Sequence, residues 1–121
     1  LEEHAELSVL TCTFFKNSAN FKGTLISITD NNSKASISNC NFNNNNGMTG
    51  GIFYVDGKSV INVENSTFYN NFALAAAISS VDNQGSIHYS NCEFNYNHAM
   101  TVGLFEILGS NVENSLSASQ V

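Results

Sequence analysis

Three aspartates, Asp30, Asp56 and Asp82, recur at intervals of 26 residues and form the clearest acidic pattern in the sequence. If the chain folds into stacked units, their carboxylates lie about 5 Å apart and could hold calcium, which takes roughly six to eight oxygen ligands. Alternatively, each aspartate begins a turn by accepting a hydrogen bond from its own backbone. Asp30 stands one place out of register if Ile28 matches Val55, which favours the turn interpretation.

The three cysteines allow at most one disulfide. Cys12 and Cys40 would occupy neighbouring units with Cα atoms about 4.8 Å apart, a separation that a disulfide can bridge. Side chains in register on parallel strands rarely reach the required dihedral angle, and Ser66 occupies the same column. We therefore expect buried free thiols that fill small spaces in the core, with Cys92 two units away from Cys40. The sequence has no Cys-x-x-Cys pattern, so it does not predict a zinc site.

Two segments match the N-glycosylation pattern, Asn31-Asn32-Ser33 and Asn65-Ser66-Thr67. Chance matches are expected in a chain with 20 asparagines and 16 serines. Asn31 falls in an expected turn and Asn65 in an expected strand. Asn31 is therefore the better acceptor if a eukaryote secretes the chain.

Composition and charge argue against several other functions. The net charge is −6, with four lysines and no arginine, so a nucleic-acid-binding protein is not expected. The lack of arginine also removes the usual base of a polysaccharide lyase. No histidine (His4, His88 or His98) precedes a glycine, and no two aspartates are adjacent, unlike the sites of polysaccharide hydrolases. We expect no enzyme and no cofactor, and no run approaches the roughly 18 apolar residues of a membrane span.

A repeat determines the elements that position these residues. Four segments share a phenylalanine, a small residue two places before it and an asparagine three places after it, and the phenylalanines are 28, 26 and 26 residues apart. The three columns are Phe14, Phe42, Phe68 and Phe94; Asn17, Asn45, Asn71 and Asn97; and Cys12, Cys40, Ser66 and Cys92. Each unit also contains a short apolar run that ends at a turn signal. Four repeats in register strongly indicate a solenoid.

The length and patterning of the unit predict β-structure. Helical solenoids need units of about 33 residues or more, whereas apolar positions here alternate or form short runs between turn residues. Three short strands and three turns account for one rung, meaning one circuit of the chain. We expect an all-β, right-handed parallel β-helix of about four to five rungs with 26–28 residues per rung. It forms one domain over residues 1–121, with rungs at 7–33, 34–58, 59–84 and 85–109 and a partial rung at 110–121.

Stacking of the rungs predicts a role for each column. The phenylalanines should stack inside the coil, where adjacent aromatic pairs contribute about 0.5–1.5 kcal/mol beyond burial. The cysteine and serine column, two residues earlier, should share this inward face. The asparagine column suits a tight turn with left-handed geometry. Its amides can also donate to one neighbour and accept from the other, forming a ladder.

Several other side chains have more than one possible place. Phe53 and Phe105 alternate away from their inward neighbours, so they form either an outward apolar stripe or, if the strand bends, part of the core; the core is favoured. Tyr69 and Tyr96 beside the phenylalanine column are undecided. His88 shares an alternation position with a serine and an asparagine of other rungs, which predicts the solvated face.

The ends of the sequence suggest a piece of a longer solenoid. Leu1 stands where an initiator methionine would be, and no signal-peptide pattern follows. Residues 1–6 could form a small cap, because open β-helix ends expose strand edges that proteins normally cover. Residues 110–115 resemble 62–66 and begin a further rung. We expect either a fragment or a chain whose ends a partner covers.

The motif Phe-x-x-Asn followed by Gly-Gly-Ile occurs at Phe42 to Asn45 and at Gly50-Gly51-Ile52. It resembles the repeat of chlamydial polymorphic outer-membrane proteins and related right-handed β-helix repeats of protist surface proteins. The resemblance covers residues 7–116, although the third repeat has Ala76-Ala77 and the fourth Val102-Gly103 in place of the glycine pair. It implies a passenger-type stalk used in adhesion, with no catalytic residues to transfer.

We therefore expect a non-catalytic structural or adhesive β-helix module of a cell-surface or extracellular protein. One alternative is a scaffold segment of a large multiprotein assembly, its ends and flat faces covered by protein partners or by neighbouring rungs of the same chain. Another is a catalytically inactive β-helix that binds glycans.

Overall fold

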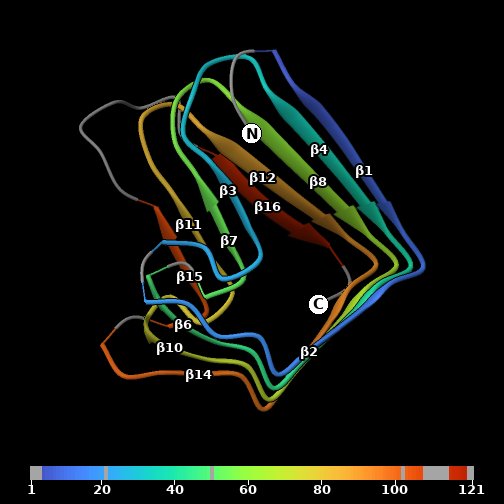
Figure 1. The fold of residues 1–121 in the computed structure, drawn as a ribbon, viewed down its shortest axis with the longest axis vertical. Coiled ribbons are helices and arrows are strands. Elements are labelled where there is room, and N and C mark those ends of the chain that lie inside the picture. Colours follow the sequence, from blue (N-terminus) through green and yellow to red (C-terminus); the bar gives the residue numbers. More distant parts are fainter. Residues whose placement is uncertain (1–3, 21, 50, 102, 108–114, 120–121) are drawn as a thin grey trace.

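The computed structural model describes residues 4–20, 22–49, 51–101, 103–107 and 115–119, and it contains strands in four parallel sheets (Figure 1). Sheet A contains β1 (Glu6–Leu10), β4 (Lys34–Ser38), β8 (Val60–Glu64), β12 (Ser86–Ser90) and β16 (Ser115–Ser119). Sheet B contains β2 (Thr13–Phe15), β5 (Asn41–Asn43), β9 (Thr67–Tyr69) and β13 (Glu93–Asn95). Sheet C contains β6 (Asn46–Thr49), β10 (Phe72–Ala75) and β14 (His98–Ala99). Sheet D contains β3 (Ile26–Ile28), β7 (Phe53–Val55), β11 (Ser79–Val81) and β15 (Phe105–Ile107).

The chain passes through sheets A, B, C and D in turn and then returns to sheet A one strand further along. Each circuit is one rung, and every strand pairs in parallel with the equivalent strand of the next rung. The expected all-β parallel β-solenoid is therefore confirmed. Within the described residues, no helix is long and apolar enough to cross a membrane.

A rung contains four strands where the sequence predicted three. The additional strand follows the asparagine column and forms sheet C, with Phe72 paired to both Asn46 and His98. A residue with positive φ just before each column asparagine bends the chain there, so one extended segment becomes two. In the first rung only two bridges, at Ser18 and Lys22, take the place of a strand in sheet C.

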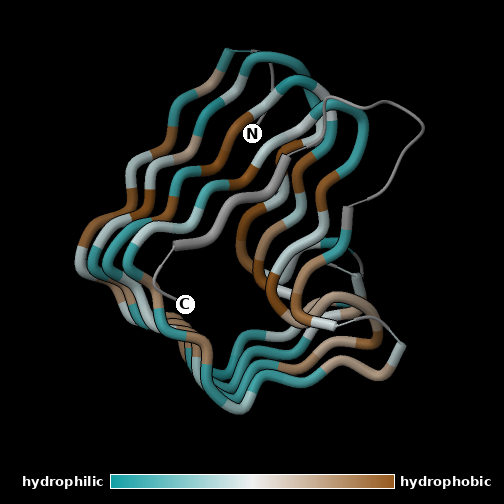
Figure 2. The backbone as a smooth tube through the Cα atoms, turned by 180° about the vertical axis from the view of Figure 1, so that it is seen from behind, coloured by the Kyte–Doolittle hydropathy of each residue, from teal (hydrophilic) through white to brown (hydrophobic). Residues whose placement is uncertain are grey.

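The core lies between the sheets and follows from alternation along the strands. On β4 and β8 the inward residues Ala35, Ile37, Ile61 and Val63 are buried, while the residues between them face outward. Figure 2 shows this alternation of hydrophobic and hydrophilic residues along sheet A. Since a shift by one residue would turn every inward side chain outward, the alternation also specifies the register.

The structure revises the expectations for both ends. Residues 1–3 lie outside the described part, but the carbonyl of Ala5 already accepts a hydrogen bond from the N–H of Lys34 at 2.9 Å, and Glu6 begins β1. Residues 5–6 therefore belong to the first rung and not to a cap.

At the other end, the resemblance of residues 110–115 to residues 62–66 predicted that the two segments take equivalent positions in their rungs, and this prediction is wrong. Ser115 pairs with Ser86, and Leu116 pairs with Ile87. This register brings the apolar residues Leu116 and Ala118 opposite the inward positions of β12. Residues 110–114 lie outside the described part of the chain.

Candidate functional site

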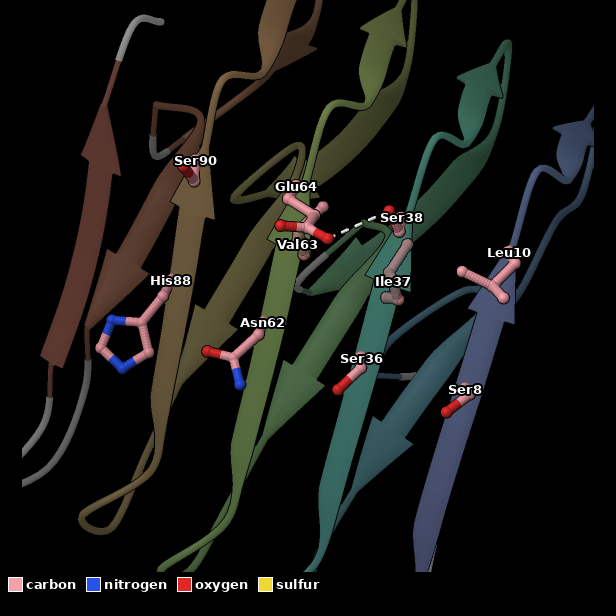
Figure 3. Close-up of a pocket in the computed structure, with 10 residues that line it drawn as sticks. All are labelled: Ser8, Leu10, Ser36, Ile37, Ser38, Asn62, Val63, Glu64, His88 and Ser90. Carbon is pink, nitrogen blue, oxygen red and sulfur yellow. Dashed lines mark hydrogen bonds between the residues drawn. The ribbon is translucent and has the colours of Figure 1, made fainter.

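A groove of about 470 Å³ crosses the outer face of sheet A. Side chains from β1, β4, β8 and β12 line it, and Figure 3 shows them along this face of the sheet. The lining residues are Ser8, Leu10, Ser36, Ile37, Ser38, Asn62, Val63, Glu64, His88 and Ser90. Of these, Ile37 and Val63 have side chains buried in the core, so their backbone forms the floor.

The strand register arranges the outward side chains of the groove in two rows that run across the strands. The first row contains Ser8, Ser36, Asn62 and His88. The second row contains Leu10, Ser38, Glu64 and Ser90. Positions two apart on a strand share a face, and adjacent strands lie about 4.8 Å apart. The first row therefore presents one polar group at each such interval.

The two rows are rich in hydrogen-bonding groups and poor in charge. They carry hydroxyls, one amide and one imidazole, and Glu64 is the one carboxylate among the lining residues. The hydroxyl of Ser38 donates to Oε1 of Glu64 at 3.2 Å, which orients the carboxylate (Figure 3). Leu10, 66% exposed, adds an apolar contact at one end. This surface can exchange many neutral hydrogen bonds with a ligand.

The asparagine column lies between sheets B and C, and hydrogen bonds engage its amides. Nδ2 of Asn45 donates to Oδ1 of Asn71 at 3.0 Å and to the carbonyl of Phe14 at 3.1 Å. The backbone N–H of Asn45 donates to the same Oδ1 at 3.0 Å. Asn17 and Asn71 donate in the same way to the asparagine of the next rung, and Asn97 ends the ladder. The predicted side-chain ladder is confirmed, and its amides serve the fold.

The column asparagines do not have the left-handed geometry that the sequence analysis assigned to them. The residue before each of them has it instead: Lys16, Asn44, Asn70 and Tyr96, with φ between 53° and 57°. The backbone N–H and the side-chain amide of a column asparagine both donate to the next rung, as in Asn45. The residue that bends the chain is therefore the one before it.

The phenylalanine column stacks inside the coil. The ring centroids of Phe14 and Phe42 are 5.0 Å apart, those of Phe42 and Phe68 are 4.7 Å apart, and those of Phe68 and Phe94 are 4.8 Å apart. The planes differ by at most 8°. The register of sheet B therefore sets the ring spacing.

The cysteine and serine column closes the turn between sheets A and B. Cys40, Ser66 and Cys92 are buried, and each side chain donates to the carbonyl two residues earlier, at 3.2, 2.8 and 3.4 Å. Cys12 does the same at 3.1 Å but is exposed, contrary to the expectation of burial. All three cysteines are free thiols. Burial raises the pKa of the Cys92 thiol, which keeps it protonated and unreactive.

The three aspartates form local turn hydrogen bonds. Asp30 accepts from the hydroxyl of Ser33 at 2.9 Å, and Asp56 and Asp82 accept from the N–H of the following residue at 2.7 and 2.8 Å. Nδ2 of Asn83 donates to Oδ1 of Asp56 at 2.8 Å, which links the turns of two successive rungs. Among the described residues, no three His, Cys, Asp or Glu side chains gather to hold a metal ion.

Both candidate glycosylation asparagines lie in exposed turns. Oδ1 of Asn31 accepts from the N–H of Lys58 at 3.2 Å. Asn65 was expected in a strand, but β8 ends at Glu64 and Asn65 has a φ of 49° in the turn that follows. Its Oδ1 accepts from Nδ2 of Asn91 at 2.6 Å.

A bulge at the start of a sheet D strand recurs at β3, β7 and β11, and at β7 it places Phe53 in the core. The N–H groups of Ile52 and Phe53 both donate to the carbonyl of Ile78 at 2.9 Å, so the alternation is broken and both side chains are buried. The Phe53 ring packs edge-on against Phe42 at 5.4 Å. Phe105 takes the equivalent position beside Phe94. The core interpretation is therefore confirmed for Phe53, and Phe105 is partly buried against the core.

A second exposed surface lies on the outer side of sheets B and C. Tyr69 and Tyr96 are exposed and pack edge to face at 5.5 Å, which answers a question the sequence left open. Next to them, the rings of Phe72 and His98 stack at 5.8 Å. His4, the remaining histidine apart from His88 of the groove, is exposed before β1.

Sequence analysis missed a compensating pair in the core. In sheet A, Tyr89 occupies the register position of the smaller Val63. In sheet D, Ser79 occupies that of the larger Phe53. The gain in side-chain volume in one sheet therefore accompanies a loss in the other. The Tyr89 and Ser79 hydroxyls are buried, and neither meets the geometry of a hydrogen bond. Burial raises the pKa of the Tyr89 phenol far above its ordinary value, against an opposing influence of the Ser79 hydroxyl. Aligning the repeats for side-chain volume would have revealed this compensation.

Lys22 and Tyr54 form a second unexpected pair, outside sheet D. Nζ of Lys22 donates to the Tyr54 hydroxyl at 3.0 Å and lies 4.5 Å from the ring centroid. The hydrogen bond to Tyr54 raises the pKa of Lys22, and burial raises the pKa of Tyr54. Lys22 lies in the irregular part of the first rung, where no repeat position could predict it.

No protein-family model, curated protein or solved structure matches this chain. The structure itself therefore assigns the fold, a parallel β-solenoid of about four turns.

Proposed function

We propose that this chain is a non-catalytic adhesive β-helix module of a cell-surface or extracellular protein. The observation that supports the proposal is the outer face of sheet A, where the first and second rows present polar side chains on adjacent strands. Sites on strands are held more precisely than sites on loops. A stack of rungs is thus suited to presenting a fixed surface to a binding partner.

The side-chain ladders support the structural part of this proposal. The asparagine, phenylalanine and cysteine–serine columns each bond or stack along the solenoid axis. These contacts link every rung to its neighbours, so the module is stiff along its axis. Stiffness is the property that a stalk needs to hold a binding surface away from its attachment.

The repeat motif supports the proposed location. Phe42 to Asn45 and the Gly50-Gly51-Ile52 segment resemble the repeat of chlamydial and protist surface proteins. We propose that the chain belongs to this kind of adhesive repeat, and that the protein containing it is displayed outside the cell.

An antibody raised against this chain tests the proposed location. We expect it to label intact cells of the source organism without permeabilisation. Labelling that requires permeabilised cells would contradict the surface location. Incubating the purified chain with a panel of polysaccharides tests the absence of catalysis, and new reducing ends would contradict it.

A further inference from the structure

We propose that the groove on the outer face of sheet A binds an uncharged, linear glycan that runs across the strands, parallel to the two rows. This inference rests on the proposed adhesive function and names the class of partner that the module would hold. The groove combines a defined volume of about 470 Å³ with side chains from four neighbouring strands.

The hydrogen-bonding groups of the groove match those of a sugar chain. Hydroxyls of Ser36, Ser38 and Ser90 can both donate and accept, as can the amide of Asn62. Sugar hydroxyls also donate and accept, so the two surfaces can satisfy each other. Leu10, on the same face, can cover the C–H face of a sugar ring, which a purely polar surface would leave without an apolar contact.

The charge of the groove selects against acidic glycans. None of the four lysines of the chain lines it, and Glu64 provides a negative charge. Lys34 is exposed on the same face two positions before Ser36, and its register partner on β1 is the acidic Glu6. The net charge of the chain, −6, adds to the repulsion of anions. Uronates, sulfated sugars and nucleic acids are therefore poor ligands, whereas a neutral glycan meets no electrostatic barrier.

The composition of the groove argues against a protein partner. Protein interfaces are enriched in aromatic residues, methionine and arginine and are depleted in serine and glutamate. Three of the four strands that line the groove, β1, β4 and β12, supply serines, and β8 supplies Asn62 and Glu64. Met48 and Leu74 of sheet C, together with Met100 just after β14, are exposed and have the composition of a protein contact instead.

The periodicity of the rows favours a repeating ligand. Ser8, Ser36, Asn62 and His88 follow one another on adjacent strands, with about 4.8 Å between strands. A linear glycan presents the same chemical groups at each sugar unit, so neighbouring sugars can form similar contacts with neighbouring rungs. The buried Ile37 and Val63 hold the floor in place, and the Ser38 to Glu64 hydrogen bond holds the carboxylate. Little ordering is therefore needed on binding.

Titration of the labelled chain with sugar hexamers, followed by amide chemical shifts, tests the proposal. The probes are neutral hexamers of β-1,4-linked glucose, α-1,4-linked glucose and β-1,4-linked N-acetylglucosamine, with hexagalacturonate as the anionic comparator. We expect at least one neutral hexamer to bind and to shift the amides of β4, β8 and β12. We expect hexagalacturonate to bind at least tenfold more weakly.

A double variant, Ser36→Ala with Asn62→Ala, removes two adjacent groups of the first row without touching the core. We expect it to weaken binding of the neutral hexamer at least tenfold and to leave the melting temperature unchanged. The matched control is Ser18→Ala with Asn95→Ala, which removes the same two chemical groups from exposed positions outside the groove. We expect it to bind as the wild-type chain does.

Three results would overturn the inference: no binding of any neutral hexamer, equal weakening in the two double variants, or tighter binding of hexagalacturonate. None of them bears on the labelling of intact cells, so a failed titration removes the glycan and leaves the surface module. Conversely, labelling that appears only after permeabilisation contradicts the proposed function whatever the titration shows.

Discussion

At the scale of single residues, Asn71 shows how one side chain holds three rungs together. Its Nδ2 donates to Oδ1 of Asn97 and to the carbonyl of Phe42, both at 2.9 Å. Its Oδ1 accepts from the N–H and from Nδ2 of Asn45, both at 3.0 Å. Asn71 is buried. If its side chain were removed, water could not readily take its place as the hydrogen-bond partner of these groups.

We expect Asn71→Ala to lower the free energy of unfolding by about 3 kcal/mol, because it leaves buried donors and acceptors without partners. Denaturant unfolding measures the change. Asn95→Ala is the control, since Asn95 is exposed on β13, and we expect a change within about 0.5 kcal/mol. Equal losses in the two variants would show that the ladder adds nothing beyond the asparagine composition.

Tyr89 is the opposite case, a buried side chain with an unsatisfied polar atom. Its ring packs against Phe94 and Phe105 at 5.3 Å, while its hydroxyl has the Ser79 hydroxyl nearby but outside the geometry of a hydrogen bond. We expect Tyr89→Phe to keep the ring packing and to raise the free energy of unfolding by about 1 kcal/mol, because the buried hydroxyl no longer has to lose its water. A loss of stability would mean that the hydroxyl does make a favourable contact.

The same residue predicts how stability depends on pH. Burial raises the pKa of Tyr89 in the folded state, so above about pH 10 the unfolded chain releases a proton that the folded chain keeps. Stability should therefore be full below that pH and fall as the pH rises. Tyr54 contributes with the same sign, so we expect Tyr89→Phe to reduce this fall without abolishing it. Denaturant midpoints between pH 8 and 11 measure the effect, and an unchanged fall in the variant would contradict it.

At the scale of elements, turns and bulges decide which way each strand faces. A left-handed residue precedes sheet B in each rung: Thr11, Asn39, Asn65 and Asn91, with φ between 49° and 55°. Asparagine tolerates this geometry, whereas a β-branched threonine is strained in it. The first rung therefore has a threonine, Thr11, where the equivalent turns of the other rungs have an asparagine.

We expect Thr11→Asn to raise the free energy of unfolding by about 1 kcal/mol, because it relieves the backbone strain at this exposed turn. Thr13→Asn is the matched control, since Thr13 is an exposed residue in β2, where threonine is favoured. We expect the control to leave stability unchanged or slightly lower. Thermal unfolding of both variants decides the matter, and a gain from Thr13→Asn as large as that from Thr11→Asn would contradict the turn argument.

At the scale of the whole molecule, each rung contacts its immediate neighbours, as expected for a repeat protein. Sheet A has β8 at its centre, whereas β2 and β14 are edge strands of sheets B and C. Strands with a partner on both sides can form backbone hydrogen bonds with both neighbours, whereas an edge strand forms them on one side. Local stability should therefore vary along the solenoid axis.

Amide hydrogen exchange measures this variation. We expect the slowest exchange in β7, β8 and β9, which pair on both sides, and faster exchange in β2 and β14. The phenylalanine and asparagine ladders add to the protection of the central rungs. Slower exchange in β2 than in β8 would contradict the nearest-neighbour picture.

The sequence by itself determined the parallel β-solenoid and the columns of Phe, Asn and Cys or Ser, because stacking puts equivalent residues of a repeat in contact. It could not determine events within a rung. Only the tertiary structure showed that the bend precedes Asn45, that a bulge turns Phe53 inward, and that Tyr89 compensates for Ser79. These depend on the direction of individual N–H groups and on volume across the core, which no residue specifies alone. The groove on sheet A was likewise decided by the structure, since it is formed by four strands that the sequence separates by whole rungs.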